Sequence, residues 1–149
     1  MTTPVRVFVG IPAFGAQLYA ETALALVNAA TYWPDLRVEI RSSALLCLLR
    51  NQLWHEAVNL ARTGDLTHFV FLDSDVAPQD PRWLDVLLRE ADQHHAALLG
   101  CVVPIKGRAG DTSTARETDD AWHPKNIRID ELSLLPTTWT EPGLLVPLG

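Results

Sequence analysis

A chain of 149 residues, 48% of them hydrophobic, is long enough to form one domain with a buried core. The formal net charge of −6 argues against broad electrostatic binding to nucleic acid or to an anionic membrane surface. No apolar run reaches the roughly 18 residues that a membrane-spanning helix requires. Because the first residues lead directly into a strand pattern, we expect no signal peptide, no membrane span and a cytoplasmic protein.

The two cysteines, Cys47 and Cys101, lie in a leucine-rich and a valine-rich segment. Their spacing matches neither a CxxC motif nor a zinc site, so the sequence gives no indication of a disulfide or of structural zinc. We expect both to be small buried hydrophobic side chains.

Strand and helix patterns alternate along the first two thirds of the chain. Proline and glycine mark several of their ends: Pro34 follows the first helix and Gly64 follows the second. The expected elements, in chain order, are a strand over 5–11, a helix over 21–30, a strand over 36–41, a helix over 44–62, a strand over 68–72, a helix over 82–94 and a strand over 97–103. Three such alternations predict an α/β fold with a mainly parallel central sheet, right-handed crossovers and helices on both faces.

The last third of the chain has a different character. Glycine, hydroxyl and charged residues predict a long flexible loop over 104–122, and loops of this length in compact domains are usually functional or disordered. A short helix is expected over 129–135, and the apolar segment 143–148 resembles the beginning of a strand. That strand either closes an edge of the sheet, or the chain lacks a C-terminal part that relatives would have.

The apolar run 69–72 ends in Asp73-Ser74-Asp75, which places two carboxylates one residue apart. In open α/β sheets, ligands bind at the carboxyl ends of the strands. Two neighbouring carboxylates repel each other unless a positive group shares the site, and a divalent cation is the usual solution. Asp-x-Asp also arises by chance as a solvated turn, especially in a chain with 18 acidic residues. The preceding strand favours the metal site over the turn.

Arg50-Asn51 interrupts an apolar run in a helix that otherwise has the composition of a core helix. An arginine is seldom buried without a partner. Either the guanidinium of Arg50 extends into solvent, or it reaches across to Asp73 or to a phosphate group, which its fork geometry suits. Hydroxyl groups and cations at the other expected strand ends would likewise suit a metal-bound phosphate: Pro12–Gly15, Arg41–Ser43 and Pro104–Lys106.

Three blocks of the sequence together resemble nucleotide-diphospho-sugar glycosyltransferases of the GT-A fold, especially family 2-like enzymes of bacteria and phages. Val7–Pro12 is similar to their first strand, Leu49–Gln52 to their Ala-Arg-Asn segment, and Phe71–Asp75 to their Asp-x-Asp strand end. The resemblance covers roughly residues 5 to 115. It implies a Rossmann-like GT-A fold in one nucleotide-sugar-binding domain over 1–149, with an active-site loop over 104–122 and a short or absent acceptor side.

The resemblance implies metal-dependent transfer of a sugar from a UDP- or GDP-linked donor to an acceptor hydroxyl. It implies that Asp73 and Asp75 bind Mn²⁺ or Mg²⁺, with the cation bridging the diphosphate. The donor sugar, the acceptor and the stereochemistry stay open, and a homo-oligomer is compatible with the family. The residues that the resemblance assigns to the nucleotide and its phosphates are Pro12, Ala13, Phe14, Gly15, Arg50, Asn51, Asp73 and Ser74.

The chain departs from the family in its acceptor-side half, where relatives carry an acidic general base. An inverting transfer needs a carboxylate that takes the proton of the acceptor hydroxyl. The candidates for this base are Glu117, Asp119, Asp120 and Glu141.

Two other functions compete with glycosyl transfer. One is a nucleotide-sugar-binding module without activity. The other is a haloacid-dehalogenase-like phosphatase, in which an apolar strand also ends in Asp-x-Asp. The phosphatase motif wants Thr or Val at the position of Ala77, and it usually lies near the N-terminus.

Overall fold

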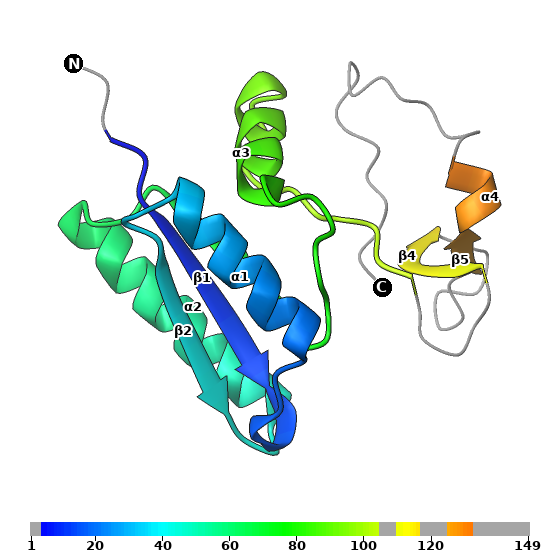
Figure 1. Ribbon diagram of the computed structural model, residues 1–149, viewed down its shortest axis with the longest axis horizontal. Helices are drawn as coiled ribbons and strands as arrows, with labels where there is room; N and C mark the ends of the chain where they lie inside the picture. The colour runs from blue at the N-terminus through cyan, green and yellow to red at the C-terminus, as the bar shows by residue number, and fades with distance from the viewer. Residues whose placement is uncertain (1–3, 105–109, 117–124, 133–149) are drawn as a thin grey trace. The chain divides into compact units, whose positions relative to one another are not determined.

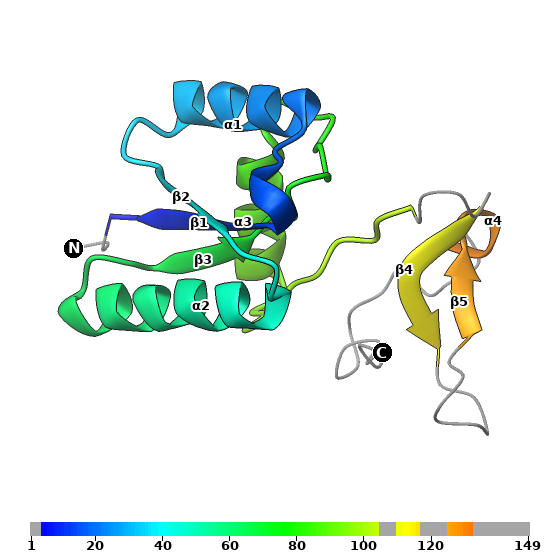
Figure 2. The ribbon, with the colours of Figure 1, turned by 90° about the horizontal axis from the view of Figure 1, so that it is seen from below.

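The computed structural model describes residues 4–104, 110–116 and 125–132, and its strands and α-helices are labelled across Figures 1 and 2. The chain forms two compact units, Met1–Leu87 and Leu88–Gly149, and each is described by itself. The single domain over 1–149 stays a prediction. Among the helices of the described residues, none is both long and apolar enough to cross a membrane.

The first unit contains a three-stranded parallel sheet in the order β2-β1-β3. β1 spans Val7–Ala13, β2 spans Arg37–Ser42 and β3 spans His68–Phe71. All seven residues of β1 are buried, because strands flank it on both sides and helices cover both faces. The predicted α/β class with a parallel sheet is confirmed for this unit, and the arrangement is consistent with a Rossmann-like fold.

Helices α1 (Ala20–Tyr32) and α2 (Leu46–Thr63) cover opposite faces of this sheet, as Figure 2 shows. α1 ends just before Trp33-Pro34, as expected from the restriction that proline places on the preceding residue. α2 ends at Gly64, which adopts the left-handed conformation with φ 80°. The N–H of Gly64 donates to carbonyls of the last turn, so the predicted glycine cap is confirmed.

The core between the sheet and α2 sets the position of that helix. Phe8 and Leu53 are fully buried and belong to one cluster, and the ring of Phe69 packs against it. Gly10 permits this close approach, because a Cβ atom there would lie 3.0 Å from the Phe69 ring and 3.3 Å from Leu53 Cβ. The packing holds Arg50, one helical turn before Leu53, on a helix that lies close to the sheet.

The beginning of α3 (Trp83–Gln93) is tied to α1 by two tryptophans. Trp83 Nε1 donates to the carbonyl of Ala25 at 3.3 Å, and Trp33 Nε1 donates to Asp85 Oδ1 at 2.9 Å. Trp83 is buried and Trp33 is half-buried, and the N–H of each finds an acceptor on the other helix. Asp85 also accepts a hydrogen bond from Arg82, and this carboxylate raises the pKa of the Arg82 guanidinium.

The second unit contains the antiparallel pair β4 (Asp111–Arg116) and β5 (Lys125–Arg128), followed by the short helix α4 (Ile129–Leu132). Thr112 is fully buried, and its hydroxyl donates to the carbonyl of Ile127 at 2.7 Å. Ile127 is also buried, so these two residues form the inner side of the pair.

The predicted strand over 97–103 is wrong. These residues have irregular structure, and Leu98 is 78% exposed. A strand needs a hydrogen-bonded neighbour, and among the described residues the only bridge nearby joins Pro104 to Thr112. An apolar, β-branched segment therefore does not form a strand unless a second strand pairs with it.

The predicted loop over 104–122 is wrong in part, because 111–116 forms β4. Its β-branched threonines suit a strand once β5 supplies the partner. The predicted helix over 129–135 is confirmed where the structure describes it, as α4. Residues 105–109 and 117–124, the end of that helix and the predicted strand over 143–148 lie outside the described residues.

The expected burial of the two cysteines is also wrong, since Cys47 and Cys101 are both exposed. Cys47 lies two residues before Leu49, which packs toward the sheet, so it falls on the other side of α2. Cys101 lies in the irregular segment after α3. Although the residue is exposed, surrounding atoms desolvate its thiol in part and so raise the thiol pKa. A leucine-rich helix of this kind exposes part of its apolar surface.

Candidate functional site

The carboxyl ends of the three parallel strands meet at one edge of the first unit. Ala13 at the end of β1 lies opposite Ser42 of β2, and the neighbouring strand β3 ends at Phe71, opposite Gly10. From β1 the chain moves outward to β2 and then returns to the other side of β1. Open α/β sheets bind ligands at such a reversal of strand order. The structure thus brings Pro12–Gly15 and Asp73–Asp75 to neighbouring strand ends.

Arg50 forms an ion pair with Asp73 at this edge. Its Nη2 donates to Asp73 Oδ1 at 2.9 Å, from the second turn of α2 to the residue just beyond Leu72. The two side chains are 44% and 46% exposed. The guanidinium therefore reaches the carboxylate, as one of the two interpretations predicts, while half of its surface stays in water. An exposed pair of this kind contributes about 0.2–1 kcal/mol to stability.

The backbone of the Asp-x-Asp segment is held by α1. Residues 73–76 form a turn in which the last N–H donates to the first carbonyl at 3.1 Å. The carbonyl of Ser74, between the two carboxylates, accepts from the N–H of Tyr19 at 3.0 Å and from the hydroxyl of Thr22 at 3.2 Å. Thr22 is fully buried. These bonds fix the turn from which the two carboxylates extend.

Tyr19 and Thr22 are therefore supporting residues that the sequence reasoning missed. A weak signal was present, because Thr22 is a polar residue near the start of an Ala- and Leu-rich helix. Nothing in the sequence places that hydroxyl beside Ser74, since the contact joins residues 52 positions apart.

The end of β1 leads into a short 3₁₀ turn, η1 (Phe14–Ala16). Gly15 and Ala16 both have positive φ, 62° and 59°. The side chain of Phe14 is 65% exposed, whereas Pro12 and Ala13 are buried within β1. Of the four residues that the resemblance assigns to the nucleotide here, Phe14 and Gly15 are the ones with exposed surface. A flat exposed ring suits stacking on a base.

The remaining predicted residues lie on the same edge with different surroundings. Asn51 is exposed beside Arg50 on α2, and its side chain makes no hydrogen bond within the described part of the chain. Ser74 is half-buried and Asp75 is exposed. The candidate bases Glu117, Asp119, Asp120 and Glu141, together with Lys106, lie outside the described residues.

The carboxylates of Asp73 and Asp75 fit a hard divalent cation. Mg²⁺ and Mn²⁺ prefer oxygen ligands, and Mg²⁺ is usually bound by one or two carboxylates together with waters and substrate phosphates. Within residues 4–104, 110–116 and 125–132, no group of three or more His, Cys, Asp or Glu side chains could hold a metal. Two carboxylates alone do not form an all-protein metal cage, so a cation here would need water or a bound phosphate group for its other ligands.

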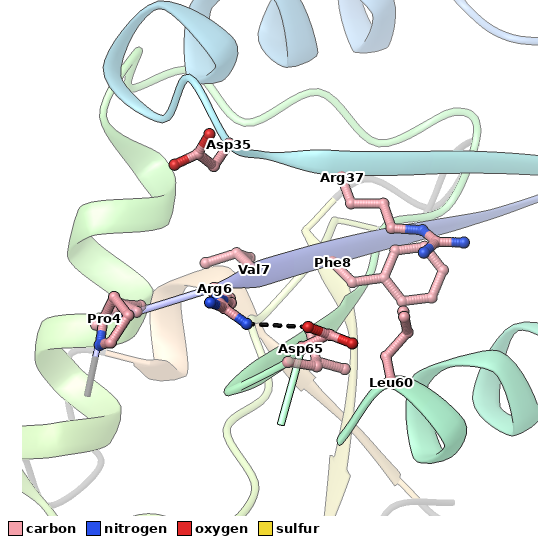
Figure 3. A pocket seen from close by; sticks show the side chains of 10 residues that line it. Pro4, Arg6, Val7, Phe8, Asp35, Arg37, Leu60 and Asp65 are labelled. Atoms are coloured by element: carbon pink, nitrogen blue, oxygen red, sulfur yellow. Dashed lines mark hydrogen bonds and ion pairs between the residues drawn. The ribbon is translucent and has the colours of Figure 1, made fainter. Parts of the chain in front are cut away.

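A pocket of about 670 Å³ lies elsewhere, where the strands begin (Figure 3). Both arginines that line it have carboxylate partners: Arg6 donates to Asp65 Oδ1 at 3.0 Å, and Arg37 pairs with Glu56 while lying 5.3 Å from the ring centre of Phe8. Ligands of parallel sheets bind at the carboxyl edge, opposite this pocket. We therefore place the candidate site at Asp73 and Arg50.

Comparison of the chain with protein-family models, with curated proteins and with solved structures gives no match. The resemblance to GT-A glycosyltransferases thus rests on the residues of its three sequence blocks. The structure adds two observations: a parallel α/β sheet, and an ion pair between Asp73 and Arg50 at the carboxyl edge of that sheet.

Proposed function

We propose that this chain binds a nucleoside diphosphate sugar through a divalent cation at Asp73 and Asp75, and transfers the sugar to an acceptor hydroxyl. The observation that carries the proposal is the 2.9 Å contact between Arg50 and Asp73 at the carboxyl end of β3. It brings together a carboxylate for a cation and a guanidinium for a phosphate, the two groups that a metal-bound diphosphate needs. The fold that we infer is a Rossmann-like fold of the GT-A type.

Each exposed group at this edge has a role in the proposal. The bound cation would stabilise the negative charge of the departing nucleoside diphosphate. Asp73 and Asp75 hold the cation, and Arg50 donates to phosphate oxygens. Phe14 stacks on the base, and Gly15 lets the backbone come close to the nucleotide because it has no side chain.

Binding and transfer are separate parts of the proposal. Transfer requires a base for the acceptor hydroxyl, and the four candidate acids lie outside the described residues. A nucleotide-sugar-binding module without transferase activity is the second candidate, because binding alone needs no such base.

Calorimetric titration of UDP, GDP and their sugar conjugates, with and without Mn²⁺, tests the binding part. We expect binding that requires the metal and that Asp75→Ala abolishes. Asp35→Ala is the matched control, because it removes a carboxylate from the pocket where the strands begin. Metal-independent binding, or equal binding by Asp75→Ala and the wild type, would contradict the proposal.

Activity assays separate the alternatives. Release of nucleoside diphosphate from the bound donor in the presence of acceptor hydroxyls supports transfer, and metal-dependent binding with no turnover supports the binding module. Hydrolysis of a generic phosphomonoester that Asp73→Asn removes would instead establish the phosphatase.

A further inference from the structure

Two cations compete for the carboxylate of Asp73. One is the guanidinium of Arg50, whose Nη2 donates to Oδ1 at 2.9 Å. The other is the divalent cation of the proposed function. A guanidinium at hydrogen-bond distance occupies one approach to that oxygen, and its positive charge repels an incoming metal ion. Metal binding at Asp73 therefore favours departure of Arg50.

The guanidinium of Arg50 is placed so that it can move away from Asp73. It is 44% exposed, and within the described part of the chain Asp73 is its only hydrogen-bonding partner. Exposed pairs of this kind shift an equilibrium by a factor of about five at most. Arg41 is different, because it contacts both Glu39 and Glu56.

We propose that Arg50 is an exchangeable counter-ion, and this inference rests on the proposed function of the site. Without metal, Arg50 neutralises Asp73. When a divalent cation binds Asp73, the guanidinium moves to the diphosphate that the cation accompanies. Metal alone then competes with Arg50, whereas metal and diphosphate bind cooperatively, because each makes the exchange more favourable for the other.

The exchange predicts opposite effects of one substitution on two affinities. Arg50→Met should bind Mn²⁺ alone about threefold to fivefold more tightly than the wild type, measured from the electron paramagnetic resonance signal of free Mn²⁺. The matched control is Arg6→Met, which removes the same charge from an ion pair with Asp65 that is 3.0 Å long and also half exposed. Its Mn²⁺ affinity should stay within about twofold of the wild type.

The second affinity is that of the Mn²⁺-saturated protein for UDP and GDP, measured by calorimetry. Arg50→Met should bind the nucleotide about tenfold or more weakly, because it has lost a charged hydrogen-bond donor to phosphate. The nucleotide affinity of Arg50→Lys should fall between those of the wild type and Arg50→Met, since an ammonium keeps the charge without the bidentate geometry. A residue that merely supports the fold would lower both affinities together.

The outcomes distinguish this inference from the function on which it rests. If the wild type binds Mn²⁺ and Arg50→Met binds it equally or more weakly, the exchange is contradicted and the proposed function stands. If neither protein binds Mn²⁺ or the Mn²⁺–nucleotide complex, the proposed function itself is contradicted. Arg50→Gln repeats the test with a polar side chain on the helix surface, and circular dichroism confirms that each variant is folded.

Discussion

The two edges of the parallel sheet use their charged groups differently. Where the strands begin, Arg6 donates to both Asp65 and the Gly64 carbonyl, and Thr67 bonds the backbone of Arg6 in both directions. Where the strands end, the one partner of the Asp73 carboxylate among the described residues is the half-exposed Arg50.

A pocket lies at the first of these edges, where Arg6 and Arg37 already have carboxylate partners. A ligand that binds Asp73 has one half-exposed ion pair to replace, which costs about 1 kcal/mol or less.

The largest expected effect concerns the core that supports both edges. Leu53→Ala removes a fully buried side chain beside Phe8 and should lower the free energy of unfolding by about 2–5 kcal/mol. Trp54→Ala, the adjacent residue, is the control, because Trp54 is 56% exposed. Urea denaturation measures both, and equal losses would show that α2 does not pack on the sheet through Leu53.

The next effect separates the two edges directly. Asp75→Ala should weaken metal-dependent nucleotide binding about a hundredfold or more, because it removes one of two carboxylate ligands. Asp35→Ala should leave the affinity unchanged, since Asp35 lies at the other edge. Calorimetry in Mn²⁺ compares the two, and a loss of equal size in Asp35→Ala would remove the distinction between the edges.

A smaller effect is expected at the end of β1. Phe14→Ala should weaken nucleotide binding about tenfold, because stacking of a base on an aromatic ring is worth about 1–3 kcal/mol. The exposed ring of Tyr19 provides a control at the same edge, as Tyr19→Ala keeps the N–H that bonds Ser74. Comparable losses from both substitutions would place the base away from Phe14.

The smallest effect is expected where the strands begin. Asp65→Asn breaks the ion pair with Arg6, and should reduce stability by less than about 1 kcal/mol because both side chains are half exposed. Thermal melting at low and high salt measures it, with the difference shrinking at high salt. A loss of stability well above this value would show that the Arg6–Asp65 ion pair contributes strongly to the stability of the fold.

Much of the first unit was predictable because its local signals agree with its packing. The run from Val7 to Ile11 is continuous and apolar, as a central parallel strand requires, and Gly64 supplies a conformation that few residues tolerate. Placing Asp73 at a strand end followed from the same reasoning. The contact with Arg50 was one of two open interpretations, because sequence cannot decide between a distant partner and solvent.

The second unit was harder to predict because its strands depend on partners. The apolar segment 97–103 is irregular, while the polar segment 111–116 is a strand that pairs with 125–128. At the site, β1 extends to Ala13, two residues beyond the predicted end at residue 11. Pro12 and Ala13 are therefore buried, whereas the family resemblance assigns them to nucleotide binding.

The central claim is that the carboxyl edge binds a nucleoside diphosphate sugar through a cation shared with Asp73 and Asp75. Its most direct test is calorimetric titration of UDP- and GDP-linked sugars into the wild-type protein with Mn²⁺ and with a chelator. We predict that at least one donor binds with Mn²⁺, that the chelator abolishes this binding, and that Asp75→Ala abolishes it too. Absence of binding by every donor in Mn²⁺, or binding that the chelator leaves unchanged, would contradict the account.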